Sequence, residues 1–199
     1  VIFDDIKVDA VKIGMVSKIE SIKAISEALR EIKDLPPIVL DPVMVSTSGY
    51  KLLSDDAKET LIKELFPLST LITPNLPEVE EILGIKIEDV EDMKEAAKKL
   101  KKLGTKYVLI KGGHLKNDAT DLLFDGENFI YFKEQKINTN NTHGTGCTLS
   151  SAIAANLAKG MSIEEAVRES KEYITLAIKH GFKIGHGVGP TNHFYELYK

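Results

Sequence analysis

The stretch T-L-I-T-P-N-L-P-E-V-E-E-I-L-G, from Thr70 to Gly84, carries the pattern that decides the fold. Its apolar start, residues 70–73, predicts a short buried strand, and residues 75–83 have the apolar spacing of a helix. Gly84 suits the end of that helix, because glycine adopts the left-handed conformation common there. A strand that leads directly into a helix is the unit from which α/β proteins are built.

The same alternation continues on both sides of this stretch. The sequence predicts strands at 10–16, 38–40 and 107–111, and helices at 17–33, 54–65 and 91–103. Residues 120–124 and 129–133 flank an Asp-Gly pair, which predicts a hairpin, and the last third of the chain is helical. We therefore predict an α/β fold with a mainly parallel central sheet flanked by helices, in a single domain spanning residues 1–199.

The composition of the chain limits the partners and the compartment that we expect for it. The chain has 199 residues, of which 43% are hydrophobic, and a formal net charge of −4, so nothing in its charge favours nucleic acid as a partner. No apolar run approaches the ~20 residues that span a bilayer, and we expect no membrane partner. The single cysteine cannot form an internal disulfide, which favours the reducing cytoplasm.

The turn N-T-H-G-T-G-C, from Asn141 to Cys147, is the strongest functional signal. It precedes a run of small residues that predicts a closely packed helix. The first N–H groups of a helix are unpaired and lie at the positive end of its dipole, so such a turn binds anions. A thiol beside a phosphate site indicates phosphoryl transfer. The alternative is a glycine-rich loop that only reverses the chain.

Asp41, Asn75 and Lys111 each follow a predicted strand, at the edge where open α/β sheets bind ligands. Asp41 could hold a cation through water, or it could simply initiate a turn before Pro42. Lys111 precedes two glycines and could meet a nucleotide phosphate, or it could be a solvated lysine.

Asn75 and Glu78 lie three residues apart at the start of a predicted helix. Amide and carboxylate oxygens in this arrangement suit Mg²⁺ bound through its water molecules. The same spacing also suits a capping box, in which the two side chains pair with each other's backbone. The local sequence leaves both interpretations open.

The segment G-H-G-V-G-P-T-N-H, from Gly185 to His193, has the composition of a loop in which two backbones approach closely. It follows no strand and opens no βαβ unit, so a dinucleotide-binding fold is unsupported. The chain also lacks the G-x-x-x-x-G-K-[ST] pattern of P-loop kinases.

Five motifs together resemble one enzyme family. They are D-P-V-M-V-S-T-S-G at 41–49, T-P-N-L-P-E at 73–78, K-G-G-H at 111–114, N-T-H-G-T-G-C at 141–147 and G-P-T-N-H-F at 189–194. In this order and spacing, from Asp4 to Tyr195, the chain resembles the hydroxymethylpyrimidine and phosphomethylpyrimidine kinases of the ribokinase-like superfamily. These enzymes act in thiamine biosynthesis.

The resemblance implies a ribokinase-like three-layer sandwich, ATP and Mg²⁺ as cofactors, and a homodimer. It also implies phosphorylation of the small-molecule alcohol 4-amino-5-hydroxymethyl-2-methylpyrimidine, followed by phosphorylation of its monophosphate to the diphosphate. A pyridoxine or pyridoxal kinase of the same superfamily is the alternative enzyme. A nucleotide-binding fragment without activity is the alternative outside catalysis.

Matching motif to motif, the resemblance also implies roles for individual residues. The residues expected around the transferred phosphoryl group are Gly144, Thr145, Gly146 and Cys147. Those expected at the nucleotide are Asp41, Asn75, Glu78, Lys111 and Thr142, with Asp41 and Glu78 holding the metal through water. Those expected at the pyrimidine are Met15, Val43 and Cys147. A helix N-terminus favours the thiolate form of a cysteine, so we expect Cys147 to accept the proton of the substrate hydroxyl.

The chain departs from the family pattern in one respect. Family members carry a further N-terminal portion with a glycine-rich segment, and this chain begins with V-I-F-D-D at Val1, after that portion. Either the sequence is a fragment or that portion was not recorded. If the portion is truly absent, we expect a sheet without those strands and a pyrimidine pocket that lacks one wall.

Overall fold

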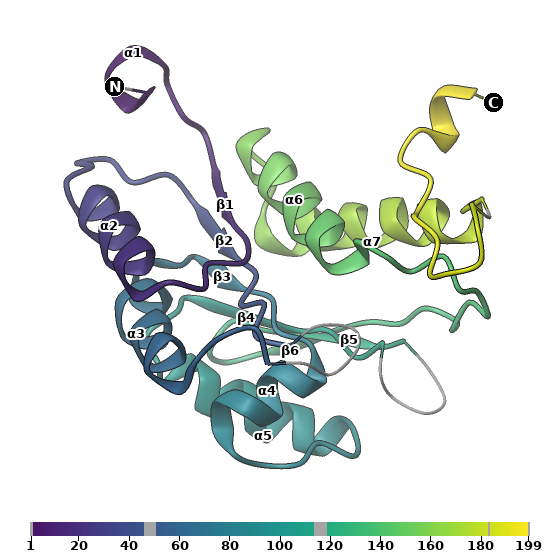
Figure 1. Ribbon diagram of the computed structural model, residues 1–199, viewed down its shortest axis with the longest axis horizontal. Helices are drawn as coiled ribbons and strands as arrows, with labels where there is room; N and C mark the ends of the chain where they lie inside the picture. The colour runs from purple at the N-terminus through teal and green to yellow at the C-terminus, as the bar shows by residue number, and fades with distance from the viewer. Residues whose placement is uncertain (1, 46–50, 114–118, 183, 199) are drawn as a thin grey trace.

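The computed structural model describes residues 2–45, 51–113, 119–182 and 184–198, which form an α/β fold around a six-stranded sheet (Figure 1). In sheet order, which is also chain order, the strands are β1 (Val11–Ile13), β2 (Ile38–Leu40), β3 (Leu71–Ile72), β4 (Tyr107–Ile110), β5 (Asp121–Phe124) and β6 (Phe129–Phe132). β1 to β4 are parallel, whereas β5 and β6 are antiparallel to their neighbours. The sheet is therefore mixed, and the predicted parallel arrangement describes its first four strands.

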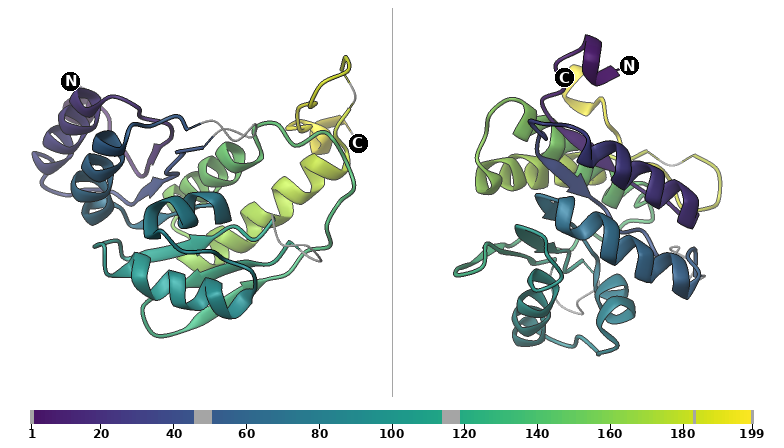
Figure 2. Two further views of the ribbon diagram at one scale, coloured as in Figure 1. Left: turned by 60° about the horizontal axis from the view of Figure 1, so that its bottom comes forward. Right: turned by 90° about the vertical axis from the view of Figure 1, so that its left-hand side faces the viewer.

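Helices cover both faces of this sheet (Figures 1 and 2). One face carries α2 (Ile19–Arg30), α3 (Asp55–Leu65), α4 (Leu76–Leu83) and α5 (Val90–Lys101), and the other carries α6 (Thr145–Ala158) and α7 (Ile163–Lys179). Short helical turns complete the chain: α1 (Ile2–Asp5), Phe66–Leu68 and Tyr195–Tyr198. Among the described residues, no helix has the length and apolar content needed to cross a membrane.

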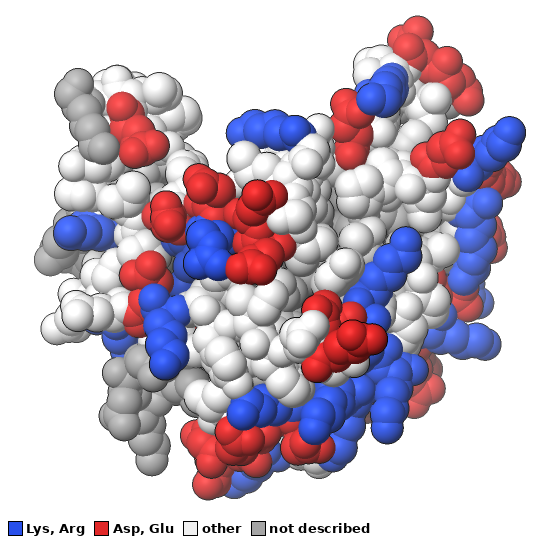
Figure 3. Space-filling view, turned by 180° about the vertical axis from the view of Figure 1, so that it is seen from behind, with Lys and Arg blue, Asp and Glu red and all other residues white. Residues whose placement is uncertain are grey.

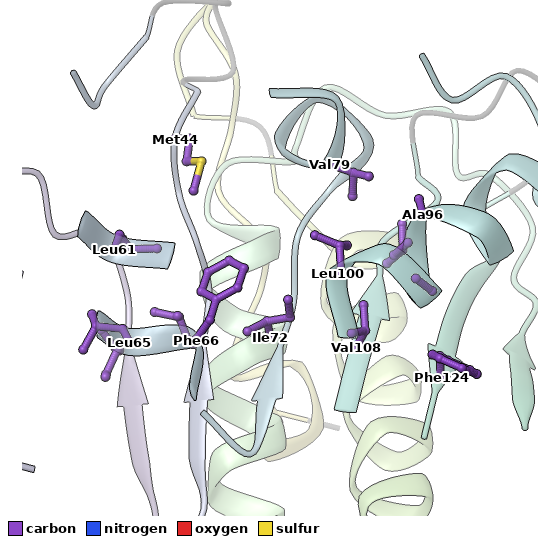
Figure 4. Packing of buried hydrophobic residues seen from close by; sticks show 14 of the residues in the cluster. Met44, Leu61, Leu65, Phe66, Ile72, Val79, Ala96, Leu100, Val108 and Phe124 are labelled. Carbon is purple, nitrogen blue, oxygen red and sulfur yellow. The ribbon is translucent and has the colours of Figure 1, made fainter. Parts of the chain in front are cut away.

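Two hydrophobic cores hold the layers together. Successive residues of a strand point to opposite faces, so Leu40 joins the core under α2 to α5 while Val39 joins the core under α6 and α7. Figure 4 shows the first of these cores, in which Phe66 and Ile72 are fully buried. The second contains Ile153 of α6, also fully buried. The strands thus fix the position of α6 relative to the sheet.

Local signals set most helix ends where the sequence predicts them. Ser162 and Glu165 form a capping box at the start of α7. Gly84 follows α4 with a φ of 65°, in the left-handed region. The first predicted strand, at 10–16, is shorter in the structure, because pairing with β2 ends at the Ile13–Leu40 pair.

Charges are mixed on the molecular surface shown in Figure 3, where acidic and basic side chains lie beside one another. On α5, for example, Lys94 pairs with Glu91 and Lys98 pairs with Glu95, each at 2.6 Å. Such exposed pairs contribute little to stability. They are consistent with the small net charge of −4.

Replacing Ile153 with alanine tests the anchoring of α6. The side chain is fully buried between α6 and the sheet, so the substitution leaves a cavity. We expect the free energy of unfolding to fall by about 2–5 kcal/mol, measured by urea unfolding. Leu197→Ala is the control, because that side chain is 77% exposed and should change stability by less than about 0.5 kcal/mol. Equal, small losses in both variants would contradict the packing of α6.

Candidate active site

A row of polar side chains lies on the α6–α7 face, across β2 to β5. We call Asp41, Thr73, Lys111 and Asp121 the polar row. Each is two residues from an apolar residue of the core under α6 and α7, namely Val39, Leu71, Leu109 and Leu123. Because alternate residues share a face, the four polar side chains share that face too. Backbone hydrogen bonds between neighbouring strands continue past the ends of β2, β3 and β4. Asp41 N–H donates to Ile13 O, Thr73 N–H donates to Leu40 O, and Lys111 N–H donates to Pro74 O.

Asp41 is the most connected member of the polar row. It is 1% exposed, and its Oδ1 accepts hydrogen bonds from Lys111 Nζ at 2.8 Å and from Thr73 Oγ1 at 3.1 Å. Ser150 Oγ of α6 lies 3.4 Å from its Oδ2. A buried carboxylate is tolerated when it is paired and hydrogen-bonded in this way. Asp41 therefore ties β2, β3, β4 and α6 together at one point.

The start of α6 lies directly over this ion pair. Gly144 is the N-cap with a φ of 81°, so the first turn contains Thr145, Gly146 and Cys147. A Cβ atom placed on Gly146 would lie 3.2 Å from Lys111 Nζ and 3.8 Å from Asp41 Oδ2. A side chain at this position would require the end of the Lys111 side chain to shift by a few tenths of an ångström, so glycine suits the close approach of the helix start to the lysine.

The first turn of α6 presents unpaired donors beside Lys111. Within the described residues, Thr145 N–H lies 3.4 Å from Thr142 O and Thr148 N–H donates to Gly144 O, but no carbonyl accepts from Gly146 or Cys147 N–H. Free amides at the positive end of a helix and a lysine ammonium are a site for an anion such as phosphate.

Lys111 keeps its positive charge although its side chain is only 14% exposed. Burial by itself lowers the pKa of this ammonium, but the nearby carboxylates of Asp41 and Glu78 outweigh burial and raise the pKa above its ordinary value. The cation is therefore available to a phosphate at neutral pH.

Asn75 and Glu78 form a capping box at the start of α4. Asn75 N–H donates to Glu78 Oε2 at 2.8 Å, and Glu78 N–H donates to Asn75 Oδ1 at 2.9 Å. Of the two interpretations left open by the sequence, the capping box is present in the structure. The capping box does not test whether the same two residues bind a metal ion.

Glu78 has a second property that capping does not explain. It is 2% exposed, and burial raises its pKa to about 7; Lys111 lowers it in part and Asp41 raises it further. Two buried carboxylates, Asp41 and Glu78, thus both interact with Lys111. In the described part of the chain, no three His, Cys, Asp or Glu side chains are grouped as a metal site. The oxygens of Asp41 and Glu78 fit Mg²⁺, which binds through one or two carboxylates, water and substrate phosphates.

The other residues expected in the site come from the first turn of α6 and from the segments that follow β1 and β2. Cys147 is exposed on the first turn of α6, which packs against β1 and β2. Met15, 58% exposed, follows β1, and half-buried Val43 follows β2, so both lie at the same edge of the sheet. The motif residues Ser46 to Gly49 and His114 lie outside the described residues.

The glycine-rich segment near the C-terminus supports the turn that precedes α6. His143 N–H donates to Gly189 O, and Gly189 N–H donates to Asn140 O, both at 3.1 Å. A Cβ atom on Gly189 would collide with the Asn141 side chain. The expected close approach of two backbones is therefore confirmed. This close approach positions Thr142, which is exposed. The carbonyl oxygen of Thr142 accepts a hydrogen bond from Thr145 Oγ1 at 2.8 Å.

Three polar residues of the site escaped the sequence analysis as site residues: Thr73, Ser150 and Asp121. Thr73 could have been found from strand periodicity, since it follows Leu71 by two residues. Ser150 could have been found from helix periodicity, since it lies one turn after Gly146 and donates to its carbonyl at 3.1 Å. The same strand periodicity places Asp121 two residues before Leu123, but its pairing with Lys171, 50 residues away, has no local signal.

Comparison with known proteins identifies the family. The family model described as phosphomethylpyrimidine kinase matches residues 1–192. The chain belongs to the phosphomethylpyrimidine kinase family. A hydroxymethylpyrimidine/phosphomethylpyrimidine kinase of Streptomyces coelicolor is 44% identical over 196 residues, which cover 98% of this chain and 72% of the relative.

Solved structures of phosphomethylpyrimidine kinases and of pyridoxal kinases share the fold. A phosphomethylpyrimidine kinase from Clostridium difficile is 51% identical, with a TM-score of 0.78 over 89% of this chain and 72% of the other. Pyridoxal kinase of Bacillus subtilis, solved as an ADP complex, is 41% identical, with a TM-score of 0.89 over 98% of this chain and 73% of the other.

The raised pKa of Glu78 predicts a pH-dependent stability. Its ordinary pKa is 4.5 and its folded pKa is about 7, so between these values the folded state holds a proton that the unfolded state has released. Stability from this group is therefore lost as pH rises from 4.5 to 7. Glu78→Gln keeps the capping geometry and removes the titration. The variant should gain on the order of 3 kcal/mol relative to the wild type across that window.

Urea unfolding in metal-free buffer at several pH values measures this difference. Glu81→Gln is a matched control on the same helix, because hydrogen bonds from Lys58 and Lys51 lower the pKa of Glu81 and move its effect below pH 4.5. A stability difference between Glu78→Gln and wild type that stays constant from pH 5 to 8 would show that burial does not perturb Glu78.

Proposed function

We propose that this chain transfers phosphoryl groups from ATP to 4-amino-5-hydroxymethyl-2-methylpyrimidine and then to its monophosphate, in thiamine biosynthesis. Membership of the phosphomethylpyrimidine kinase family supports the reaction. The observation that carries the proposal is the placement of Lys111 directly beneath Gly146, beside the unpaired N–H groups of the first turn of α6. This is where phosphoryl transfer needs fixed positive charge.

Each residue of the site has a task in this proposal. Lys111 offsets the charge of the ATP phosphates, and Thr142 and Asn75 contact the nucleotide. The Gly144–Cys147 turn, with Thr145 and Gly146, stabilises the charge that develops on the transferred group. Met15 and Val43 line the pocket that holds the pyrimidine ring. Cys147 accepts the proton of the substrate hydroxyl as the new bond forms.

Mg²⁺ would be held by Asp41 and Glu78 through water, and it would supply charge neutralisation at the phosphates. Glu78 supports this assignment, because a carboxylate whose charged form is disfavoured by burial gains from a nearby cation. The paired state of Asp41 with Lys111 also keeps the phosphate-binding lysine and the metal-binding carboxylate at a fixed distance from one another, 2.8 Å.

Pyridoxal or pyridoxine phosphorylation is the second candidate. The observation that favours it is the likeness to Bacillus subtilis pyridoxal kinase, at a TM-score of 0.89. Met15 and Val43 would contact either heteroaromatic alcohol. A coupled ADP-release assay with the pyrimidine alcohol, its monophosphate and pyridoxine separates the two activities. Turnover of the two pyrimidines supports the proposal, turnover of pyridoxine alone replaces it, and no turnover supports a nucleotide-binding fragment.

We also propose a homodimer in the cytoplasm, as expected from the family resemblance. Sedimentation velocity of the purified chain gives the oligomeric state. A species of 22.0 kDa at micromolar concentration would contradict the dimer.

Replacing Cys147 with alanine tests the proton acceptor. We expect kcat to fall by roughly 10²–10⁴-fold, because the group that accepts the proton is removed, whereas the dissociation constant of ADP should stay within about threefold. Steady-state kinetics and calorimetry measure the two quantities. Ser151→Ala, exposed on the same helix, is the control and should change neither. Unchanged kcat in Cys147→Ala would remove the proposed role.

A further inference from the structure

A second buried ion pair joins Asp121, a member of the polar row, to Lys171 of α7. Asp121 Oδ2 accepts a hydrogen bond from Lys171 Nζ of α7 at 2.6 Å, and the two side chains are 3% and 11% exposed. Lys171 Nζ also donates to Ala119 O at 3.0 Å. A desolvated pair this close, with an additional carbonyl acceptor, is held firmly, and breaking it would leave a buried charge.

Asp121 also acts on the main chain next to Lys111. Its Oδ1 accepts the N–H of Gly112 at 2.9 Å, so it fixes the peptide that follows Lys111. β4 and β5 pair with Ile110 opposite Leu122, and continuing this antiparallel register places Lys111 opposite Asp121. Opposite residues point to the same face of the sheet, so Lys111 has a carboxylate on each side, Asp41 and Asp121.

The two carboxylates have different partners. Lys111 Nζ donates a hydrogen bond to Asp41 Oδ1 at 2.8 Å, whereas Asp121 accepts a hydrogen bond from Lys171. The charge of Asp121 nevertheless reaches Lys111, because it adds to the raised pKa of that lysine. Without Lys171, Asp121 would be a buried carboxylate that has lost its ion-pair partner, opposite Lys111 on the neighbouring strand. The ammonium of Lys111 would then be drawn toward β5, away from the space under Gly146.

We propose that Asp121 and Lys171 are positioning residues for nucleotide binding: Asp121 fixes the peptide after Lys111, and Lys171 neutralises Asp121 so that Lys111 stays directed at the phosphate site. The inference rests on the proposed function, which places nucleotide phosphates at Lys111. It also gives α7 a role in nucleotide binding, in addition to covering the sheet.

The test compares Lys171→Met with the double variant Asp121→Asn/Lys171→Met. The single variant leaves the Asp121 carboxylate without its partner. The double variant removes both charges, and the amide oxygen that replaces the carboxylate can still accept the Gly112 N–H. We expect the dissociation constant of ADP, measured by calorimetry, to rise about tenfold in the single variant and to return to within about threefold of wild type in the double variant.

Two further variants complete the experiment. Lys171→Arg keeps the ion pair and should bind ADP like wild type. Arg168→Met is the matched control, because Arg168 lies one turn earlier on α7, is 51% exposed and pairs with Glu164; it should leave ADP binding unchanged. Thermal melting of each variant separates loss of folding from loss of binding.

Equal weakening in the single and double variants would overturn the proposal, because Lys171 would then act on the nucleotide itself. Wild-type affinity in the single variant would also overturn it. If Lys171→Met does not fold, the double variant decides: binding within threefold of wild type supports the proposal, and binding at least tenfold weaker contradicts it. Calorimetry with ADP needs no turnover, so a chain that binds ADP without phosphorylating the pyrimidine would contradict the proposed function and leave this test valid.

Discussion

The ion pair between Asp41 and Lys111 joins parts of the chain that are 70 residues apart, and the geometry of the site depends on it. It forms where β2 and β4 end on one face of the sheet, and Thr73 and Ser150 contact the same carboxylate from β3 and α6. The pair is almost fully buried, so removing either partner would leave an uncompensated charge in a poorly solvated region. That penalty keeps Lys111 in place beneath Gly146, with the free amides of α6 beside it.

Charge balance is the reason for proposing that a cation accompanies the nucleotide. Asp41 and Glu78 bring two carboxylates to the neighbourhood of Lys111, and burial already raises the pKa of Glu78 to about 7. A triphosphate adds further negative charge to the same space. Lys111 and the helix start cannot offset all of it, and this is the physical reason to propose Mg²⁺ with the nucleotide. On the other side of Lys111, Lys171 offsets the charge of Asp121.

Features that rest on local signals could be predicted from the sequence. The strand at 38–40, the cap at Ser162 and the hairpin of β5 and β6 occur as predicted, because each depends on residues close together in the chain. The shortening of the strand predicted at 10–16 depends on where β2 stops pairing, which local sequence does not contain. The Asp121–Lys171 pair joins residues 50 positions apart, so only the folded chain reveals it. The assignments of Cys147, Met15 and Val43 to catalysis and substrate binding stay predictions.

A crystal structure of the chain with a non-hydrolysable ATP analogue and the pyrimidine alcohol would show whether the phosphates bind between Lys111 and the start of α6. We expect the terminal phosphate within about 3 Å of Lys111 Nζ and of the N–H groups of Gly146 and Cys147, with the alcohol oxygen next to Cys147. A triphosphate bound more than about 6 Å from Lys111, or a closed contact between α6 and the sheet that leaves the phosphates no room, would contradict it.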